Sequence, residues 1–399
     1  MELSGRNQRV ARKSKSPYPR VCCCLLGIGL IAYCGSKQPQ IDRAMENGVE
    51  IVLNHLAPYP VKDEPTDFRL KEELTIDFGS PEIGELGIAD STSFDVDQTG
   101  FLYFFYSHKK GNTIFKFGPD GKFLKSWGSN GQGPGEVTFI SSACLTAQRH
   151  LIVSDHSSKK IVWYTDEGEL VKEVRYPSDG RYYIIDPIDE DRFVGSARVV
   201  TDRDADFFEF IFYLLDGNLE ELKKLDVYKY PNPLKKGRRG INHNYFFTAK
   251  STANSLYIGN EDRGYEILEF DLRGNPLRRI RKAYAPVKVP EDVLKKRKET
   301  YSKSGQAYYF PDHYLPICDF FLDEDERLFV MTFEKGGNPG EYVSDIFNAE
   351  GVLIKRKPLE ILSGGEVFAC AMAKRGRLYC FQEKETGFNA FKVCQLVWE

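Results

Sequence analysis

The stretch FKFGPDGKFLKSW, from Phe115 to Trp127, decides the fold. It consists of an apolar strand, a turn built from Pro, Asp and Gly, and a second apolar strand. Asp, Asn and Gly tolerate the backbone of a tight turn, whereas β-branched and aromatic residues favour strands, so the stretch predicts a β-hairpin. The same arrangement recurs four times, in WYTDEGELVKEV (Trp163 to Val174), FYLLDGNLEEL (Phe212 to Leu222), EFDLRGNPLRRI (Glu269 to Ile280) and IFNAEGVLIKR (Ile346 to Arg356).

The spacing of these hairpins indicates a repeat. Their turn glycines lie 47, 49, 57 and 77 residues apart, at Gly121, Gly168, Gly217, Gly274 and Gly351. A period of about 40 to 50 residues is typical of one four-stranded propeller blade. One hairpin would fit any all-β protein, but five with matching flanks favour a β-propeller.

A second recurring element fixes the number of blades. A short apolar strand follows a polar turn ahead of each hairpin, and six copies occur, at Phe94 to Phe105, Leu145 to Asp155, Ile188 to Ser196, Lys250 to Asn260, Phe321 to Thr332 and Ala371 to Phe381. The sixth copy lacks a fourth strand of its own. Leu70 to Glu85 aligns with the outer strand and exit loop of the first complete blade, Phe123 to Glu136. We therefore predict an all-β, six-bladed propeller over residues 70–399, closed by an N-terminal strand in the last blade, which removes open sheet edges.

One segment interrupts the repeat between the fourth and fifth blades. Lys282 to Pro316 contains VPEDVLKKRKETY, where Pro290 and two following acidic residues are typical of a helix start. The sequence thus predicts a short helical insertion. Two interpretations of it stay open: a lid over a ligand site on one face of the ring, or a loop packed on its outside.

Residues 1–34 have the pattern of a targeting leader. Six Lys or Arg residues precede the apolar run Val21 to Tyr33, which is shorter than the roughly 20 residues of a membrane-spanning helix. The run ends in Ile-Ala-Tyr-Cys, which resembles a bacterial lipobox with Cys34 as the lipidated residue. Tyr33 departs from that pattern, which has a small residue there, so an uncleaved N-terminal anchor is the alternative. Residues 35–69 contain four prolines and predict a tether, with a short amphipathic helix from Ile41 to Leu53.

The chain resembles the bacterial six-bladed β-propeller lipoproteins, which are related to NHL-repeat proteins. The resemblance covers Leu70 to Glu399 and is most specific over Ile114 to Val137. Ile152 to Val171 resembles an NHL repeat, with Asp155 at its acidic position, and Tyr309 to Val330 resembles the proline-marked entry into a late blade. The resemblance implies a propeller in the cell envelope, facing the periplasm or the cell surface.

The amino-acid composition and net charge limit the classes of partner that the protein could bind. The 399 residues are 41% hydrophobic and carry a net charge of −3, which supports a substantial core and argues against nucleic-acid binding. We expect a monomer, attached to the membrane through its N-terminal lipid or anchor. Beyond the leader, five cysteines remain, and they predict buried free thiols, with one disulfide in the last blade as the alternative: Cys144, Cys318, Cys370, Cys380 and Cys394. The glycine-rich loop Gly131 to Glu136 predicts a fixed turn between blades in which Glu136 accepts backbone hydrogen bonds.

The sequence carries no strong catalytic motif such as GxSxG or HExxH. We predict a binding module for a peptide, glycan or protein partner, without a cofactor, and with ligand-contact candidates Asp155, His156, His243, Tyr265 and His313. The alternative is a metal-dependent hydrolase or lyase, similar to the gluconolactonases, with a divalent cation such as calcium in the central channel. Its ligands would come from His108, His156, His243, His313, Asp155, Glu261, Asp262 and Asp319. A structural lipoprotein that scaffolds an envelope assembly is a third interpretation.

Overall fold

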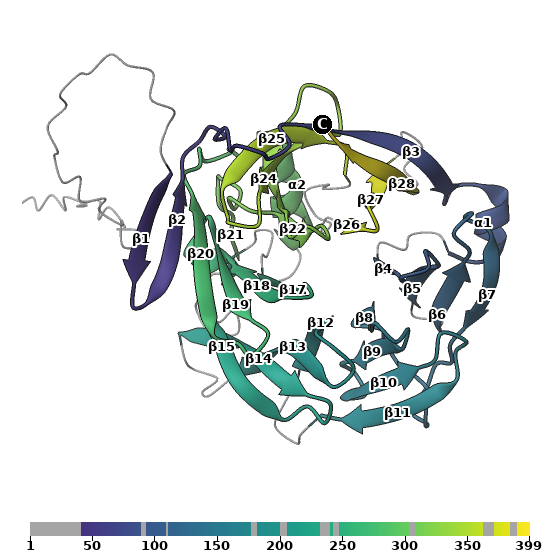
Figure 1. Cartoon of the computed structure of the whole chain (residues 1–399). Helices are drawn as coiled ribbons and strands as arrows, with labels where there is room; N and C mark the ends of the chain where they lie inside the picture. Colours follow the sequence, from purple (N-terminus) through teal and green to yellow (C-terminus); the bar gives the residue numbers. More distant parts are fainter. Residues whose placement is uncertain are drawn as a thin grey trace, which may run out of the picture. The chain divides into compact units, whose positions relative to one another are not determined.

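The computed structural model describes residues 41–88, 93–108, 111–176, 182–199, 206–231, 240–241, 247–302, 308–361, 371–383 and 389–399. The chain divides into two units, Met1–Lys37 and Gln38–Glu399. The described residues all belong to the second unit, where six blades of mainly antiparallel strands are arranged in a ring (Figure 1). The predicted leader and Cys34 lie outside the described residues.

Each blade runs from an innermost strand to an outermost one. The strands of blades 1 to 3 are β4 (Ser93–Val96), β5 (Leu102–His108), β6 (Gly111–Phe117) and β7 (Phe123–Trp127); β8 (Ser142–Leu145), β9 (Leu151–Asp155), β10 (Lys160–Tyr164) and β11 (Leu170–Arg175); and β12 (Tyr182–Pro187), β13 (Arg192–Val199), β14 (Phe207–Asp216) and β15 (Glu221–Pro231). Those of blades 4 to 6 are β17 (Phe247–Ser251), β18 (Ser255–Asn260), β19 (Glu266–Asp271) and β20 (Pro276–Lys282); β22 (Asp319–Leu322), β23 (Leu328–Lys335), β24 (Tyr342–Phe347) and β25 (Leu353–Leu359); and β26 (Ala371–Lys374), β27 (Arg377–Glu383), β28 (Asn389–Trp398) and β3 (Phe68–Asp77).

The predicted closure of the ring is confirmed. β3 pairs antiparallel with β28 as the outermost strand of blade 6, and Thr75 lies opposite Lys392. The helical insertion is also confirmed, since α2 (Glu291–Ser302) lies between blades 4 and 5. The remaining elements are short: α1 (Pro81–Glu85), the 3-10 helix η1 (Glu261–Arg263), and a two-stranded sheet of β16 (Gly240–Ile241) and β21 (Tyr308–Tyr309).

The core is divided among the seams between neighbouring blades. The described residues form six buried apolar clusters, one for each seam. At the closing seam, Phe94 and Phe104 of blade 1 meet Phe391 of blade 6 edge to face, with ring centroids 4.7 and 4.9 Å apart. Blade-to-blade packing, rather than a single central core, therefore holds the ring together.

The turn glycines explain why the hairpins repeat. Four of them have positive φ, with values of 78°, 87°, 76° and 74° at Gly121, Gly168, Gly274 and Gly351. A Cβ atom at any of these positions would lie within 2.6 to 2.8 Å of a side chain on the fourth strand of the preceding blade, namely Leu74, Trp127, Leu225 and Ile280. Each glycine thus provides the positive φ that its own turn requires, and its missing side chain leaves room for the neighbouring blade.

Blade 3 departs from this pattern, because Gly217 lies in its turn but is not the residue with positive φ. The residue with positive φ in that turn is Leu219, at 68°. The Leu219 N–H donates to the Asp216 carbonyl, as the Gly168 N–H does to the Thr165 carbonyl in blade 2. The Leu219 side chain is fully buried in the apolar cluster of the blade 2–3 seam. Burial of this side chain compensates for its unfavourable backbone conformation.

The helix predicted from Ile41 to Leu53 is wrong. These residues form a hairpin of β1 (Asp42–Glu46) and β2 (Val49–Asn54), and β2 adds in parallel to β20, so that blade 4 has six strands. The run VEIVLN contains three β-branched residues, which favour a strand.

The chain from Val49 to Asp67, here called the belt, then crosses the outside of blade 5. The Asn54 side chain bonds to the backbone of Arg281, Gly351 and Leu353, and Asp67 pairs with Lys355 and Lys357. This part of the predicted tether is therefore bound to the propeller.

Candidate functional site

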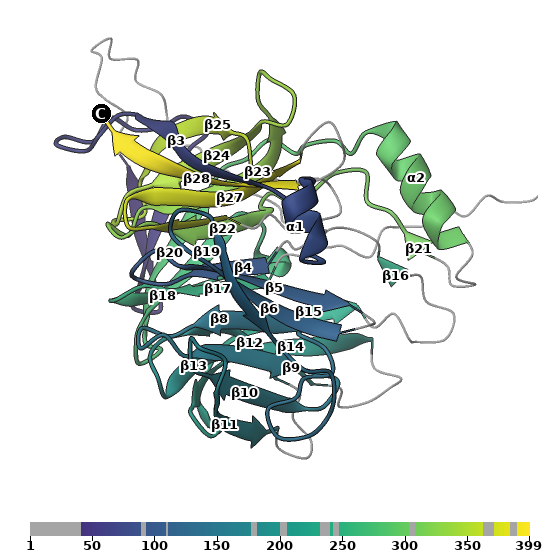
Figure 2. The same ribbon diagram turned by 90° about the vertical axis from the view of Figure 1, so that its right-hand side faces the viewer.

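A groove opens between blades 4 and 5 beside the insertion. It consists of a cavity of about 250 Å³ and an adjoining one of about 350 Å³, which share Val287, Tyr314, Phe333 and Glu334 as lining residues. We call the two cavities together the interblade groove. Figure 2 shows α2 standing on one face of the ring, and the lining segments of the insertion lead to and from this helix.

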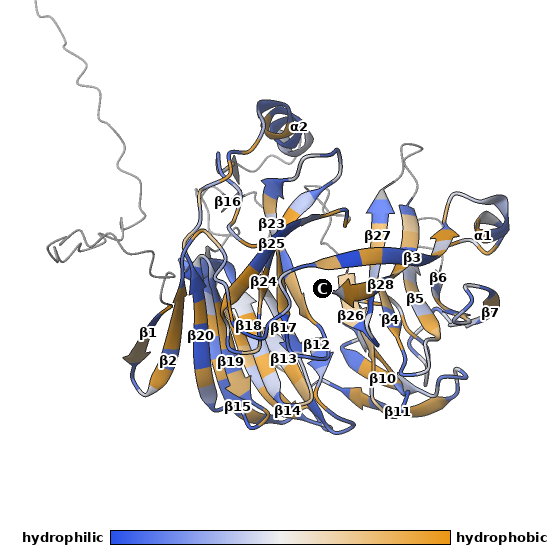
Figure 3. Cartoon of the chain, turned by 45° about the horizontal axis from the view of Figure 1, so that its top comes forward, coloured by the Kyte–Doolittle hydropathy of each residue, from blue (hydrophilic) through white to orange (hydrophobic). Residues whose placement is uncertain are grey.

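Aromatic stacking fixes one wall of the groove. The rings of Tyr314 and Phe333 are parallel, with centroids 4.4 Å apart and an interplanar angle of 5°. The buried Arg297 of α2 lies over Tyr314, 5.9 Å from its centroid. Figure 3 shows that α2 is otherwise mainly hydrophilic, so this stack attaches a polar helix to blade 5. The wall is therefore preformed.

Charged side chains form the floor of the groove. The Tyr265 hydroxyl donates to Asp345 over 2.6 Å, and Lys282 Nζ lies 3.2 Å from the same carboxylate. Arg356 donates to Asp345 over 2.7 Å and to Glu334 over 2.6 Å. Burial raises the pKa of Tyr265 well above its usual range, and burial lowers the pKa of Lys282, with Asp345 opposing that shift.

The floor is electrically balanced. Asp345 and Glu334 face Lys282 and Arg356, and each of these four groups is in an ion pair. Tyr265 in turn donates its proton to a carboxylate rather than to the cavity. The arrangement therefore presents aromatic surface and the rim residue Lys335 to a ligand, because the charged groups of the floor are paired with one another.

The structure separates the predicted ligand-contact residues. Tyr265 lies in the floor of the interblade groove. His313 is next to the groove residue Tyr314, with its side chain 47% exposed and its Nδ1 3.0 Å from Asp312. His243 lies outside the described residues.

Asp155 and His156 lie near the seam of blades 1 and 2, away from the groove. Asp155 is fully buried and accepts from the Thr138 and Ser158 N–H groups over 2.6 and 2.9 Å, and the His156 N–H donates to Ser141.

The predicted metal ligands are likewise dispersed. Asp262 accepts from the Lys229 N–H over 3.0 Å, and Asp319 accepts from the Phe320 N–H over 2.8 Å. The hydroxyl of Tyr228 donates to Glu261. The side chain of His108 lies outside the described part. Among the described residues, no three His, Cys, Asp or Glu side chains come together in a way that would hold a metal ion.

Sequence reasoning named Asp319 but missed two other carboxylates of the innermost strands, Asp95 and Asp186. Asp95 of β4 and Asp186 of β12 bond to the next blade, at the Leu145 N–H and at Ser251 respectively. Burial raises the pKa values of Asp95 and Asp319, and it raises that of Asp186 to about 6. The positive charge of Lys250 opposes all three shifts.

The charged groups of the groove were missed for a similar reason. Asp345, Lys282 and Arg356 lie within strands, where charge is normally assumed to face solvent. The strand sequence YVSDIF does contain a signal for Asp345. Apolar residues occupy both faces of this strand, so the carboxylate is expected to be buried on whichever face it lies. The partners that neutralise it come from other strands and leave no local signal.

Two predictions made outside the groove are confirmed. Glu136 accepts from the Gly133 N–H over 2.9 Å, so the glycine-rich loop is a fixed turn between blades 1 and 2. Cys144, Cys318, Cys380 and Cys394 are buried free thiols, and Cys370 lies outside the described residues.

Neither helix in the described part of the chain has the length and apolar character needed to cross a membrane.

Comparisons with known proteins agree with the architecture. Residues 96–237, which cover most of blades 1 to 3, match the model of a family described as 6-bladed beta-propeller. No curated protein matches the sequence.

Among solved structures, a member of the DUF4221 family from Bacteroides vulgatus has 12% identity and a TM-score of 0.52, covering 84% of this chain and 100% of its own. A proposed exported protein from Bacteroides fragilis has 12% identity and a TM-score of 0.47, covering 86% and 99%. A gluconolactonase from Xanthomonas campestris has 12% identity and a TM-score of 0.42, covering 84% and 99%. The chain is a six-bladed β-propeller, similar in fold to a bacterial protein of the DUF4221 family.

Proposed function

We propose that this chain is an extracytoplasmic binding propeller that holds an extended segment of a peptide or glycan in the interblade groove. One observation carries the proposal: a preformed aromatic wall, Tyr314 on Phe333, stands over a floor of paired charges. Aromatic surface with a few placed polar groups is typical of ligand sites, and aromatic rings also supply contact area at low entropic cost.

The ion pairs in the floor of the interblade groove favour a binding function over a catalytic one. Acid, base or nucleophilic chemistry needs a group that is free to exchange a proton with substrate. Lys282, Arg356 and Asp345 are saturated by one another, and Tyr265 has a raised pKa. No cofactor is needed for this role.

The proposed location in the cell envelope is inferred from the leader, residues 1–34. The basic start, the short apolar run and Cys34 support lipid attachment and a position facing the periplasm or the cell surface. The check is mass spectrometry of the N-terminus of the mature protein. An acylated Cys34 supports the proposal, and an intact residue 1 favours the uncleaved anchor instead.

The ligand is tested with the purified full-length chain against peptide and glycan arrays. Each hit is then titrated with Phe333→Leu, which keeps an apolar side chain but removes the aromatic face, and with Lys335→Glu at the rim. We expect about tenfold weaker binding for Phe333→Leu, since aromatic contacts are worth about 1 kcal/mol beyond their area.

The matched control is Phe123→Leu, which changes a partly exposed aromatic on β7 of blade 1. This variant should bind as the wild type does. Equal affinity of Phe333→Leu and the wild type would place the ligand elsewhere. Stoichiometric metal together with chelator-sensitive turnover of lactones or esters would replace the binding function with the hydrolase or lyase.

A further inference from the structure

A separate cavity of about 430 Å³ lies at the seam between blades 6 and 1. It is formed by the β26–β27, β4–β5 and β6–β7 turns together with β3. These turns lie at the ends of the blades away from the blade-to-blade connections, whereas α2 belongs to such a connection. The cavity therefore opens on the face of the ring opposite to α2.

Two arginines line this cavity, and only one of them is neutralised. Arg377 pairs with Glu73 over 2.6 Å, and the nearby Asp120 pairs with Lys122 over 3.0 Å. Arg375 is exposed, and its backbone N–H donates to Glu324. Within the part of the chain that the structure describes, its guanidinium group has neither an ion-pair partner nor a hydrogen-bond acceptor. The cavity lining holds two arginines and two carboxylates, and Arg375 is the arginine whose guanidinium has no carboxylate partner among the described residues.

The Arg375 guanidinium lies close to Gly100 of blade 1. A Cβ atom on Gly100 would lie 2.4 Å from Arg375 Nη1 and 3.6 Å from Cζ, so the group rests directly on the backbone of blade 1. Gly100 has a φ of 94°, which reinforces the need for glycine.

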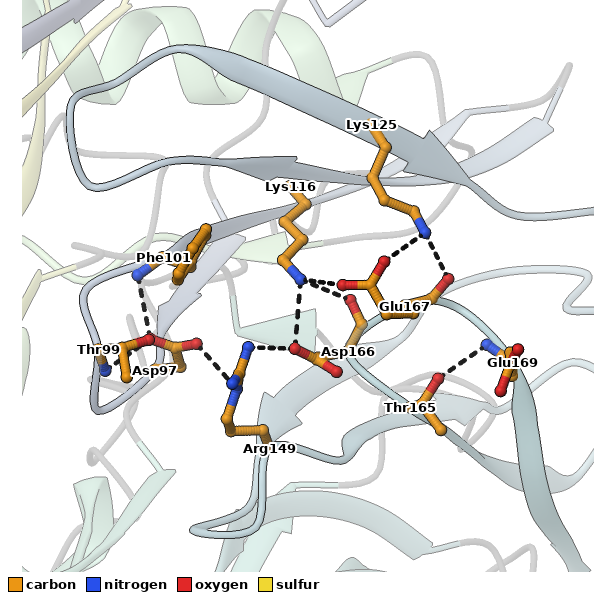
Figure 4. A network of polar contacts seen from close by, with 10 residues as sticks. All are labelled: Asp97, Thr99, Phe101, Lys116, Lys125, Arg149, Thr165, Asp166, Glu167 and Glu169. Atoms are coloured by element: carbon orange, nitrogen blue, oxygen red, sulfur yellow. Dashed lines mark hydrogen bonds and ion pairs between the residues drawn. The ribbon is translucent and has the colours of Figure 1, made fainter.

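Arg149, at the neighbouring seam, offers a comparison within the same ring. Arg149 occupies the β8–β9 turn of blade 2, which corresponds to the β26–β27 turn of blade 6. Its guanidinium lies between Asp97, at 3.2 Å, and Asp166, while Lys116 pairs with Glu167 (Figure 4). Two carboxylates thus neutralise Arg149, whereas Arg375 lacks such partners.

We propose that the cavity at the blade 6–1 seam is an anion site, in which Arg375 binds the carboxylate or phosphate group of a small molecule. Guanidinium presents two parallel N–H donors that match either oxyanion. The site does not depend on the interblade groove, which lies between other blades.

The test is isothermal titration of the full-length chain with inorganic phosphate and with citrate, at constant ionic strength. We expect saturable binding of at least one anion, and the preferred anion distinguishes phosphate from carboxylate ligands. Arg375→Gln should weaken binding at least tenfold, and Arg375→Lys should retain part of it.

The matched control is Arg273→Gln, which removes an exposed arginine from the β19–β20 turn of blade 4 and should leave anion binding unchanged. Thermal unfolding without anion verifies that each variant is folded. The proposal is overturned if neither anion binds, if heat changes follow ionic strength alone, or if Arg375→Gln and Arg273→Gln behave alike. Loss of groove binding in Phe333→Leu with intact anion binding separates the two proposals.

Discussion

At the scale of single residues, the turn glycines carry two constraints at once. Gly168 has a φ of 87°, and a Cβ atom there would lie 2.7 Å from Cγ of Trp127 on blade 1. Gly376 also has positive φ, at 65°, but nothing lies within 4 Å of its Cβ position. Substitutions at Gly168 and Gly376 therefore separate two contributions to the loss of stability: the strained backbone conformation, and the collision with the neighbouring blade.

We expect Gly168→Ala to lower the free energy of unfolding by about 2 to 4 kcal/mol, from conformational strain plus overpacking. Gly376→Ala should cost only about 1 kcal/mol, since strain alone applies. Urea denaturation monitored by tryptophan fluorescence measures both. Equal losses in the two variants would refute the role of Gly168 in blade docking.

The carboxyl of Asp186, on the innermost strand of blade 3, should make the stability of the protein depend on pH. Burial raises the pKa of Asp186 from 3.8 to about 6. Between these values the folded state binds more protons than the unfolded one, so stability falls as the pH rises from about 4 to 6 and stays lower above that range.

Asp186→Asn should remove this decline while keeping an acceptor for Ser251. Relative to the wild type, the variant gains stability between pH 4 and pH 7. Urea unfolding at pH 4, 5, 6 and 7 tests this expectation, and a parallel pair of profiles would contradict it.

At the scale of elements, the belt turns an expected tether into part of the ring. Asn54 is buried and accepts from the Leu353 N–H over 2.8 Å, and its amide donates to the Gly351 and Arg281 carbonyls over 2.9 and 3.1 Å. One side chain therefore joins blade 4 to the β24–β25 turn of blade 5. Tyr59, also buried, adds a backbone hydrogen bond to Leu353.

We expect Asn54→Ala to destabilise the protein by about 2 to 4 kcal/mol, since two buried backbone groups and one partly buried group lose their partner. The control is Asn47→Gly in the exposed β1–β2 turn, where φ is 53° and glycine is favourable. It should change stability by less than about 0.5 kcal/mol. Chemical denaturation of both variants is the measurement, and a cost below 0.5 kcal/mol for Asn54→Ala would show that the belt is not a structural element.

At the scale of the whole molecule, β3 decides whether the ring closes. It covers the edge of β28, and its residues Phe68 and Ile76 enter the apolar clusters of the two seams that flank blade 6. A chain that starts at residue 79 exposes a long edge strand and loses both side chains. A chain that starts at residue 67 keeps β3 and loses most of the belt.

We expect the chain that starts at residue 67 to fold cooperatively, with lower stability than the full chain, because β3 still completes blade 6. The chain that starts at residue 79 should aggregate or unfold without a cooperative transition. Circular dichroism and size-exclusion chromatography measure both. A synthetic peptide of residues 67–78, added in trans, should restore the native state of the shorter chain. A cooperative transition without the peptide would show that the other five blades suffice.

The sequence by itself determined the blade count, the closing strand, the position of the insertion and the buried free cysteines. These follow from local chemistry, because turn residues, strand propensity and spacing repeat along the chain. It also marked Tyr265, although it could not say what surrounds that residue.

Which charged side chains pair with one another became apparent from the tertiary structure alone. Lys282, Asp345 and Arg356 come from three strands of two blades, and Arg375 rests on a glycine 275 positions earlier in the chain. The belt was also beyond the sequence, since VEIVLN forms a strand because β20 offers it a free edge. Contacts of this kind are fixed by closure of the ring, and no spacing along a linear chain encodes them.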